Sequence, residues 1–414
     1  MRGKNKLLFI LLDGASDGLN YLKTSLDEAK TTNLSKIAKI SKGGLVYTIA
    51  KGISPESDAA ALSFLGYNPL EVQITRGVLE ALGAGLKFNE GDLALRCNFA
   101  TAVGDEILDR RVGRSLSDEE AKELVNEIVS NVNLNYDYEL VHTVGHRCVL
   151  VIRKKDKNLG SNISNLDPAY IRKGTIVHAA AIIDRKIKLC EAFDEESKIS
   201  AEIVNKFFIE SRKVLENSKI NLERKKKGLL PANILLLRDA GSSIPKVQKF
   251  EEKYKLKAAA IAEMPVEVGV AKLLGIDAYK IEYVKSLEIY KTKVNLTLDL
   301  LNKYDFVYVH IKGPDEPAHD GNFELKVKAI EEIDEYFFGE LLNKLELDKI
   351  SIFISCDHST PVFLKSHSDD PVPFIYYKPG IKPDNISKFT EKECIKGSFG
   401  ILEHAYDILN KILF

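Results

Sequence analysis

The stretch "KLLFILLDG" (residues 6–14) is an uninterrupted apolar run that ends in an aspartate and a glycine. A short apolar run bounded by turn residues is typical of a strand buried on both faces. Similar runs recur at 232–238, 304–311 and 349–355, and helical patterns occupy 57–66, 265–275 and 323–345. Alternating strands and helices predict an α/β fold, with a mostly parallel sheet flanked by helices.

The middle of the chain has a different pattern of apolar and polar residues. Residues 141–153 alternate between apolar and polar side chains, and residues 117–132 form a polar helical pattern. Sequence patterns typical of buried parallel strands lie on both sides of this region. If those outer strands belong to one sheet, the middle of the chain must leave that sheet and return to it as an insertion. We therefore expect a catalytic domain formed by residues 1–85 and 231–414, with an inserted α+β lid domain at 86–230.

Composition excludes several classes of partner. The 414 residues carry a net charge of -1, which argues against a nucleic-acid or membrane-surface partner. The basic run at 223–228 is interpreted as a solvated helix end. No stretch approaches the roughly 18 apolar residues of a membrane span. Scattered cysteines without a C-x-x-C pair indicate reduced thiols, so we expect a cytoplasmic protein; they are Cys97, Cys148, Cys190, Cys356 and Cys394.

Carboxylates and imidazoles follow three of the predicted strands. Ligand sites in open α/β sheets lie outside the carboxyl ends of the strands, so these side chains should converge. A lone "DH" or "D-x-x-x-H" is usually a surface pair or a core histidine, but joint placement after strands favours a two-metal site. Mixed carboxylate and imidazole ligands suit Mn²⁺ or Zn²⁺ better than Ca²⁺ or Mg²⁺. The candidate ligands are Asp13, Asp315, His319, Asp357, His358 and His367.

The stretch "GISPESDAAALSFLG" (52–66) supplies a candidate nucleophile. Two metal ions about 4 Å apart typically clamp the oxygens of an in-line phosphoryl transfer. A serine at a helix N-terminus has free backbone N–H groups and the positive dipole end nearby to hold phosphate oxygens. Ser54 precedes a proline and is a candidate N-cap, whereas Ser57 adjoins the alanines. We predict Ser57 as the nucleophile; the alternative is that both serines only cap the helix.

At this point the sequence resembles a known family. The order "ILLDGASDG", "SPESDAAALSFLGYNP", "HIKGPDEPAHDG" and "CDHSTP…KSHSDDPVPF" is similar to the alkaline phosphatase superfamily. Segments such as "RGVLEALGAG" (76–85), "LALRCNFAT" (93–101) and "GLLPANILLLRDAG" (228–241) resemble the archaeal-type 2,3-bisphosphoglycerate-independent phosphoglycerate mutases. Cys356 stands where that family usually has a glycine, a departure that removes no ligand.

The resemblance implies a role for each candidate ligand. Ser57 becomes a transiently phosphorylated nucleophile that also binds one divalent ion, together with Asp13, Asp357 and His358. The other ion is implied to bind to Asp315, His319 and His367. Two divalent ions are expected as cofactors, Mn²⁺ first and Zn²⁺, Co²⁺ or Mg²⁺ as alternatives, without 2,3-bisphosphoglycerate.

A phosphoglycerate carries a phosphate and a carboxylate, and the planar fork of arginine binds both groups bidentately. The inserted domain would close as a lid, because open water would hydrolyse a phosphoenzyme. Any single basic residue here is also interpretable as an ordinary surface charge. The candidate substrate-binding residues are Asp109, Arg110, Arg111, Arg114, His146, Arg147, Arg238 and Lys312.

The resemblance thus predicts interconversion of 3-phosphoglycerate and 2-phosphoglycerate through phosphoserine, a step of glycolysis and gluconeogenesis. A metal-dependent phosphomonoesterase or another phosphosugar mutase of the same superfamily is the first alternative. A metal-dependent phosphate-binding protein without turnover is the second. We expect a small-molecule substrate and neither nucleic acid nor membrane as a partner; whether the chain forms a homo-oligomer stays open.

Overall fold

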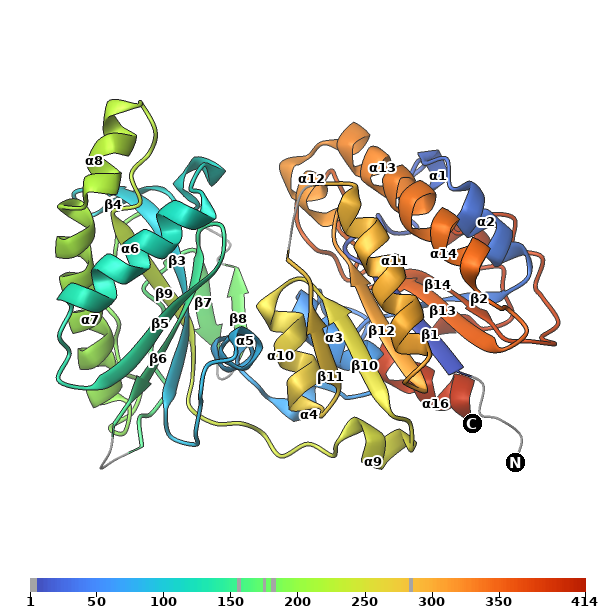
Figure 1. Cartoon of the computed structure of the whole chain (residues 1–414), viewed down its shortest axis with the longest axis horizontal. Helices are drawn as coiled ribbons and strands as arrows, with labels where there is room; N and C mark the ends of the chain where they lie inside the picture. The colour runs from blue at the N-terminus through green and yellow to red at the C-terminus, as the bar shows by residue number, and fades with distance from the viewer. Residues whose placement is uncertain (1–5, 155–157, 174–175, 180–183, 283–285) are drawn as a thin grey trace. The chain divides into compact units, whose positions relative to one another are not determined.

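A computed structural model describes residues 6–154, 158–173, 176–179, 184–282 and 286–414. The chain divides into two compact units, coloured by residue number in Figure 1. Unit 1 comprises Met1–Val72, Val247–Glu263 and Val270–Phe414. Unit 2 comprises Gln73–Lys246 and Met264–Gly269. Each unit is built on its own main sheet.

Unit 1 contains an 8-stranded sheet in the order β11-β10-β12-β1-β13-β14-β2-β15. All neighbouring strands are parallel except β14, which runs antiparallel to both β13 and β2. The predicted mostly parallel sheet is therefore confirmed. The strands are β1 (Lys6–Leu12), β2 (Lys42–Val46), β10 (Ala258–Ala262), β11 (Asp277–Lys280), β12 (Phe306–Ile311), β13 (Ile350–Cys356), β14 (Val372–Tyr377) and β15 (Gly400–Leu402).

Strand β1 occupies the middle of this sheet, between β12 and β13. Its register pairs Leu12 with Ile311 on one side and with Cys356 on the other. These three strands therefore end level with one another. The residues that follow them, from Asp13, Lys312 and Asp357 onward, emerge at one edge of the sheet.

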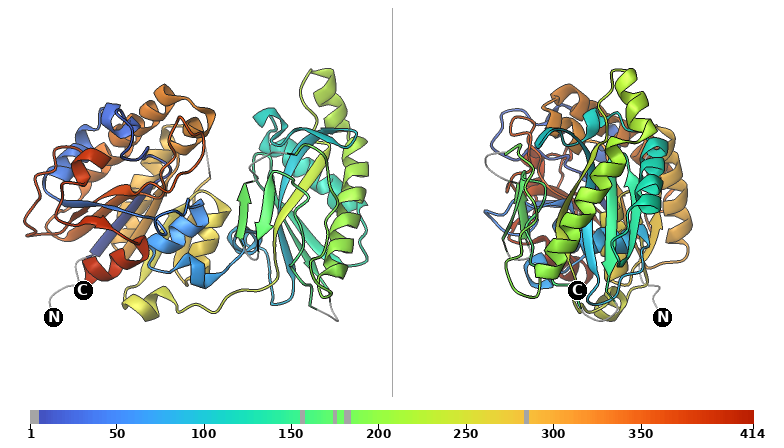
Figure 2. Two further views of the ribbon diagram at one scale, coloured as in Figure 1. Left: turned by 180° about the vertical axis from the view of Figure 1, so that it is seen from behind. Right: turned by 90° about the vertical axis from the view of Figure 1, so that its left-hand side faces the viewer.

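Helices cover both faces of the unit 1 sheet, as Figures 1 and 2 show. On one face Phe9 stacks on Phe353 with ring centroids 4.3 Å apart, and Phe64 of α3 packs against both rings. On the other face α11 packs against β10 and β12. The helices are α1 (Ser25–Glu28), α2 (Thr32–Lys39), α3 (Ser57–Phe64), α4 (Pro69–Val72), α9 (Phe250–Tyr254), α11 (Glu288–Leu301), α12 (Asp315–Asp320), α13 (Phe323–Glu332), α14 (Gly339–Lys344), α15 (Glu391–Cys394) and α16 (Ile408–Leu413).

Two helices predicted from the sequence form in a different way from the prediction. The helix predicted at 323–345 forms as α13, a π-helical segment (Ile333–Phe338) and α14 in succession. The helix predicted at 265–275 forms as α10 (Pro265–Leu273), whose first residues belong to unit 2 and whose last belong to unit 1. A short 3₁₀ turn (Ala405–Asp407) precedes α16.

Unit 2 is built on an antiparallel sheet in the order β4-β3-β6-β5, with β9 also paired to β3. A buried apolar cluster joins this sheet to α6 and α7, whereas α5 packs against β3, β6 and β9. The strands of this sheet are β3 (Leu93–Val103), β4 (Glu106–Asp109), β5 (Asp137–Val144), β6 (Arg147–Arg153) and β9 (Ile234–Gly241), and β7 (Tyr170–Lys173) and β8 (Ile176–Ala179) form a separate two-stranded sheet. The helices are α5 (Arg76–Ala84), α6 (Asp118–Asn131), α7 (Lys198–Glu216) and α8 (Lys219–Lys226), with a 3₁₀ turn at Val112–Arg114.

One predicted strand belongs to a different sheet from the one expected. The apolar run at 232–238 forms β9, but it pairs antiparallel with β3 in unit 2 and does not join the parallel sheet. All residues of β9 are buried, because α7 and α5 both pack against it. A strand covered on both faces shows the same uninterrupted apolar pattern in either kind of sheet.

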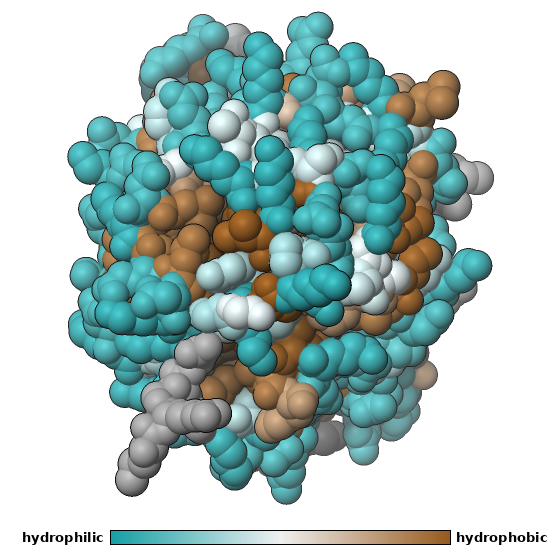
Figure 3. All heavy atoms as spheres, turned by 90° about the vertical axis from the view of Figure 1, so that its right-hand side faces the viewer, coloured by the Kyte–Doolittle hydropathy of each residue, from teal (hydrophilic) through white to brown (hydrophobic). Residues whose placement is uncertain are grey.

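Figure 3 shows one face of the molecule, on which hydrophilic side chains predominate and apolar atoms are visible between them. Within the described part of the chain, none of the helices combines the length and apolarity that a membrane crossing requires.

Candidate active site

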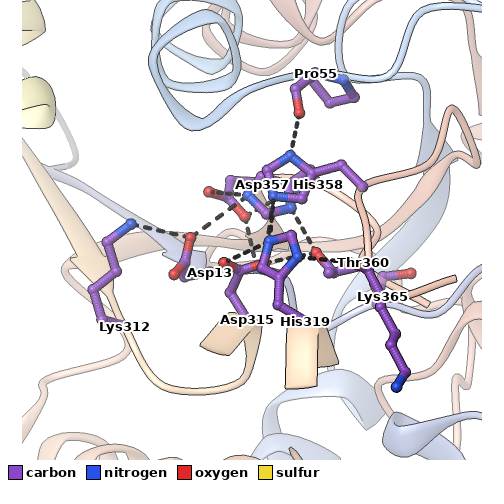
Figure 4. Close-up of polar contacts among 12 residues, drawn as sticks. Asp13, Pro55, Lys312, Asp315, His319, Asp357, His358, Thr360 and Lys365 are labelled. Atoms are coloured by element: carbon purple, nitrogen blue, oxygen red, sulfur yellow. Dashed lines mark hydrogen bonds and ion pairs between the residues drawn. The ribbon is translucent and has the colours of Figure 1, made fainter. Parts of the chain in front are cut away.

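The candidate ligands converge at the level ends of β1, β12 and β13. The backbone N–H of Asp13 donates to the carbonyl of Ile311, at 2.9 Å, and that of Asp357 donates to the carbonyl of Leu12, at 3.2 Å. Parallel pairing therefore continues one residue beyond the strands and brings two carboxylates together. Figure 4 shows these side chains pointing toward one another.

The first ligand group consists of Asp13, Asp357 and His358, all buried, with ligand atoms within 4.8 Å of one another. Nε2 of His358 lies 3.6 Å from Oδ1 of Asp13 and 3.4 Å from Oδ2 of Asp357. That nitrogen is buried and has no hydrogen-bond partner among the described residues. An orphaned nitrogen that faces two carboxylates fits a bound divalent cation.

The second ligand group consists of Asp315, His358 and His367. Nε2 of His367 lies 3.5 Å from Oδ1 of Asp315, and Nε2 of His319 lies 3.4 Å from Oδ2 of the same carboxylate. The two Nε2 atoms of His319 and His367 are 3.2 Å apart. Imidazole nitrogens aimed at one carboxylate also fit a divalent cation. The structure thus brings together the six carboxylate and imidazole ligands predicted from the strand ends, and His358 belongs to both groups.

The charges within the two groups depend on each other. Burial alone would raise the pKa of Asp13, but the ammonium of Lys312 and the neighbouring imidazole of His358 lower it well below the ordinary range. Burial likewise opposes ionisation of Asp315, yet His319 and His367 lower its pKa. Desolvation would lower the pKa of His358, but neighbouring Asp357 and Asp13 raise it. The site therefore holds ionised carboxylates that attract positive charge.

Ser57 is the first residue of α3, and it is half-buried. The N-cap position belongs to Glu56, which makes no side-chain capping bond, so neither Ser54 nor Ser57 is the N-cap residue. The loop just before the serine contacts the second ligand group, because Nδ1 of His367 lies 2.7 Å from the carbonyl oxygen of Pro55 (Figure 4). The alternative that these serines serve only as caps loses its basis in this geometry.

Three polar residues at the site were not predicted from the sequence. Nε2 of His310, inside β12, lies 3.1 Å from Oδ2 of Asp357. The hydroxyl of Thr48 donates to the backbone carbonyl of Asp357, at 2.8 Å. Thr360 contacts both His358 and Asp315, at 2.9 Å each. A histidine within an apolar strand and a threonine in "CDHSTP" were the available signals for His310 and Thr360.

The predicted substrate-binding residues lie in different places. Nζ of Lys312 is 3.1 Å from Oδ1 of Asp13, in unit 1. Arg110 is in unit 2, where its Nε donates to Asp167 at 2.9 Å. Asp109 accepts backbone N–H bonds from Arg111 at 2.7 Å and from Gly113 at 2.9 Å, which stabilises the turn that bears Arg114.

Arg147 and Arg238 belong to what we call the arginine cluster. It consists of Arg76, Arg96, Arg147 and Arg238 around the buried carboxylate of Glu80, all within unit 2. Oε1 of Glu80 lies 3.1 Å from Nε of Arg96 and 3.3 Å from Nε of Arg76. Burial and the neighbouring Arg76 lower the pKa of Arg96 to about 9, so the side chain stays protonated at neutral pH. Glu80 and Asp239, whose Oδ2 lies 3.7 Å from Nε of Arg238, balance only part of the charge of the four guanidinium groups, which leaves a net positive charge that suits an anion.

His146 lies beside this cluster. Burial, followed by the charge of Arg147 and Arg111, lowers its pKa to about 2. Tyr170 stacks on the guanidinium of Arg238, which lies 3.6 Å from the ring centroid. Arg76 and Arg96 were not among the predicted site residues. Because Arg96 lies within the buried strand "LALRCNFAT", its charge in a strand interior was the signal.

A parallel sheet whose strand ends carry two overlapping groups of carboxylates and imidazoles is characteristic of a metal-dependent α/β enzyme. A sequence profile described as 2,3-bisphosphoglycerate-independent phosphoglycerate mutase matches residues 38–221. The enzyme of that name from Aeropyrum pernix is 41% identical over 99% of this chain and 99% of its own length. The Thermococcus kodakarensis enzyme of the same name is 40% identical over 98% of this chain and 96% of its own.

Solved structures agree with these relatives. A Pyrococcus horikoshii protein aligns with a TM-score of 0.79 and 31% identity, covering 99% of this chain and 97% of its own. The cofactor-independent phosphoglycerate mutase from Thermoplasma acidophilum aligns with a TM-score of 0.63 and 29% identity, covering 99% of each chain. The chain belongs to the 2,3-bisphosphoglycerate-independent phosphoglycerate mutase family. It is an enzyme of this class, which acts on phosphoglycerate.

Proposed function

We propose that the ligand groups of unit 1 and Ser57 carry out the phosphoryl transfer between the 3- and 2-positions of glycerate. The Oγ of Ser57 loses its proton and attacks the phosphorus of 3-phosphoglycerate, the bond from phosphorus to the 3-oxygen breaks, and that oxygen takes up a proton. The bound glycerate reorients, and its 2-hydroxyl attacks the phosphoserine. In this second displacement the 2-hydroxyl loses its proton, the bond from phosphorus to Oγ of Ser57 breaks, Ser57 regains a proton, and 2-phosphoglycerate is formed.

We assign Asp13, Asp357 and His358, together with Ser57, to one divalent cation, and Asp315, His319 and His367 to the other. Bound cations would supply Lewis-acid stabilisation of charge on the transferring phosphoryl group. Mn²⁺ is the ion that we propose first, because the ligands mix carboxylate and imidazole. Zn²⁺, Co²⁺ and Mg²⁺ are the alternatives for the same ligands.

Residues of this chain hold the reacting groups in place. Ser57 lies at the N-terminus of α3, where free backbone N–H groups and the helix dipole favour phosphate oxygens. Lys312, whose ammonium lies 3.1 Å from Asp13, adds a positive charge beside the first ligand group. Such charges stabilise a phosphoryl group as it moves between two oxygens.

We assign substrate recognition and water exclusion to unit 2. Its arginine cluster carries net positive charge within buried surroundings, which suits a carboxylate or phosphate. Excluding water would favour return of the phosphoryl group to glycerate over its hydrolysis. In this proposal Asp109, Arg110, Arg114 and His146 remain candidates for substrate contacts.

The observation that carries this proposal is the contact between the second ligand group and the loop that leads into Ser57. His367 bonds to the carbonyl of Pro55, at 2.7 Å, so the ligand group and the start of α3 are joined through two residues of backbone. A serine that begins the helix directly after this loop suits the role of a metal-activated nucleophile.

The test is ³¹P NMR of the purified protein with Mn²⁺ and 3-phosphoglycerate, with 2,3-bisphosphoglycerate excluded. We expect a 2-phosphoglycerate signal that grows to a constant ratio, and phosphorylation of the 52–66 peptide by mass spectrometry. Ser57→Ala should abolish both signals. Ser54→Ala is the matched control, because Ser54 lies in the same loop and is exposed, and it should retain both.

Other outcomes would redirect the assignment. Growth of inorganic phosphate in place of 2-phosphoglycerate would indicate a phosphomonoesterase. Full activity of Ser57→Ala would overturn the proposed nucleophile. Parallel reactions with Zn²⁺, Co²⁺ or Mg²⁺ added singly to metal-free protein would identify the ion that supports the highest rate.

A further inference from the structure

Thr360 lies directly between the two ligand groups. It is fully buried in the loop after β13, two residues beyond His358. Its Oγ1 is 2.9 Å from Nδ1 of His358 and 2.9 Å from Oδ1 of Asp315 (Figure 4). One hydroxyl thus contacts a ligand from the first group and a ligand from the second.

The chemistry of these partners determines the direction of both hydrogen bonds. An ionised carboxylate only accepts, so the single hydroxyl proton of Thr360 is donated to Asp315. The oxygen of Thr360 then accepts the proton of Nδ1 of His358. A neutral imidazole protonated on Nδ1 has its lone pair on Nε2. That Nε2 is the orphaned buried atom that faces Asp13 and Asp357.

The surrounding backbone holds the hydroxyl in this position. The N–H of Thr360 donates to the carbonyl of Ser16, at 2.9 Å, and its own carbonyl accepts from Nζ of Lys326, at 2.9 Å. A Cβ atom on Gly14 would lie only 2.7 Å from Oγ1 of Thr360 and 2.6 Å from Oδ1 of Asp315. Close packing on several sides leaves the hydroxyl little freedom to rotate away.

We propose that Thr360 is a positioning residue that holds His358 in the Nδ1–H tautomer and fixes Asp315 relative to it. This inference rests on the proposed ligand assignment. It adds to that assignment a residue that contacts two of the ligands and does not itself bind an ion. Outer-shell partners of metal-binding histidines orient the ring, and their loss typically weakens metal binding by about 10- to 100-fold. Thr360 serves both ligand groups through one hydroxyl.

The experiment compares Thr360→Val, which keeps the shape and removes the hydroxyl, with Thr360→Ser, which keeps the hydroxyl. In metal-free protein, at a pH high enough to keep the ring of His358 neutral, long-range ¹⁵N–¹H NMR of the histidine rings reports which nitrogen of His358 carries the proton. We expect Nδ1–H in wild type and in Thr360→Ser, and a substantial Nε2–H population in Thr360→Val. Calorimetric titration with Mn²⁺ should show affinity about 10- to 100-fold weaker for Thr360→Val alone.

Thr48→Val is the matched control. Thr48 is also a buried hydroxyl at this site, but it donates to the backbone carbonyl of Asp357 and contacts no candidate ligand side chain in a described bond. It should leave the tautomer of His358 unchanged. Unaltered tautomer and Mn²⁺ affinity in Thr360→Val would overturn the inference, as would equal losses in Thr360→Ser.

These readouts separate failure of the inference from failure of the proposed function. The tautomer is measured without metal or substrate, and Mn²⁺ affinity is measured without turnover. If Ser57→Ala kept full mutase activity while Thr360→Val lost Mn²⁺ binding, the nucleophile assignment would fall and the role of Thr360 would stand.

Discussion

At the scale of single residues, Gly14 shows how little space the site leaves. Its φ of +59° lies in the left-handed region, and a Cβ there would collide with Asp315 and Thr360. Its N–H also donates to Oδ1 of Asp357, at 2.9 Å. A glycine at this position therefore serves both the turn and the close approach of two ligand loops.

We predict that Gly14→Ala weakens Mn²⁺ binding and lowers the free energy of unfolding by about 1–3 kcal/mol, from backbone strain and the displaced carboxylate. Gly104→Ala is the control, because Gly104 has a similar φ of +56° and nothing within 4 Å of its Cβ position. The control should show a smaller loss of stability and unchanged Mn²⁺ affinity in calorimetric titration. Equal effects of both variants on Mn²⁺ affinity would contradict this explanation.

His146 provides a prediction about pH. Burial and nearby guanidinium groups lower its pKa from 6.5 to about 2, so the folded protein keeps this imidazole neutral where the unfolded chain would protonate it. Stability is therefore lost as the pH falls below about 6.5, by roughly 1 kcal/mol at pH 5.5. NMR should show that the ring of His146, assigned with His146→Gln, stays neutral down to pH 4. A titration midpoint near 6.5 would contradict the proposed charge environment.

At the scale of secondary-structure elements, α13 connects the loops that carry the ligands. Lys326, fully buried on α13, donates to the carbonyls of Ser16, at 3.0 Å, and Thr360, at 2.9 Å, and pairs with Asp17 at 2.7 Å. One ammonium thus joins the loop after β1 to the loop after β13. This arrangement holds the two loops that carry the ligands in place relative to each other.

Lys326→Met should destabilise the protein by about 3–5 kcal/mol, because it leaves the buried carboxylate of Asp17 unpaired. The matched control on the same helix is Lys328→Met, since the Lys328 side chain is 68% exposed. Urea unfolding followed by circular dichroism measures both variants. Adding Asp17→Asn to Lys326→Met should recover part of the loss, and an absence of recovery would argue against the buried pair.

Individual elements also show why some sequence predictions failed. Strand β10 has the sequence AAAIA and was not predicted, because alanine favours helix in isolation. It is a strand because it pairs with both β11 and β12. Tertiary pairing overrides local preference in such a short segment.

At the scale of the whole molecule, all the candidate metal ligands belong to unit 1 and the arginine cluster belongs to unit 2. We predict that chelation of divalent ions raises hydrogen exchange in segments 13–18 and 357–362 and leaves segments 93–103 and 147–153 unchanged. Without a cation the clustered carboxylates repel one another, and a bound ion stabilises only the unit that binds it. Hydrogen-exchange mass spectrometry before chelation, after chelation and after Mn²⁺ is restored measures this difference. Equal increases in both units would contradict it.

Local sequence patterns were enough to predict the central strands and the candidate ligands. Apolar runs marked β1, β12 and β13, and the acidic and imidazole side chains at their carboxyl ends followed directly from parallel pairing. These features depend on local pattern, because burial on both faces requires uninterrupted apolar residues. For this reason Asp13, Asp315 and Asp357 could be grouped before the fold was known.

Contacts between segments that are distant in the sequence could be known only from the folded chain. The placement of β9 beside β3, the bond from Thr360 to Asp315 and the convergence of Arg96 with Arg76 on Glu80 join residues far apart in sequence. The sequence around a threonine or an arginine is the same kind of sequence whether the side chain lies on the surface or at a functional site. The role of that side chain depends on which partners the fold buries beside it, and that information is absent from any single segment.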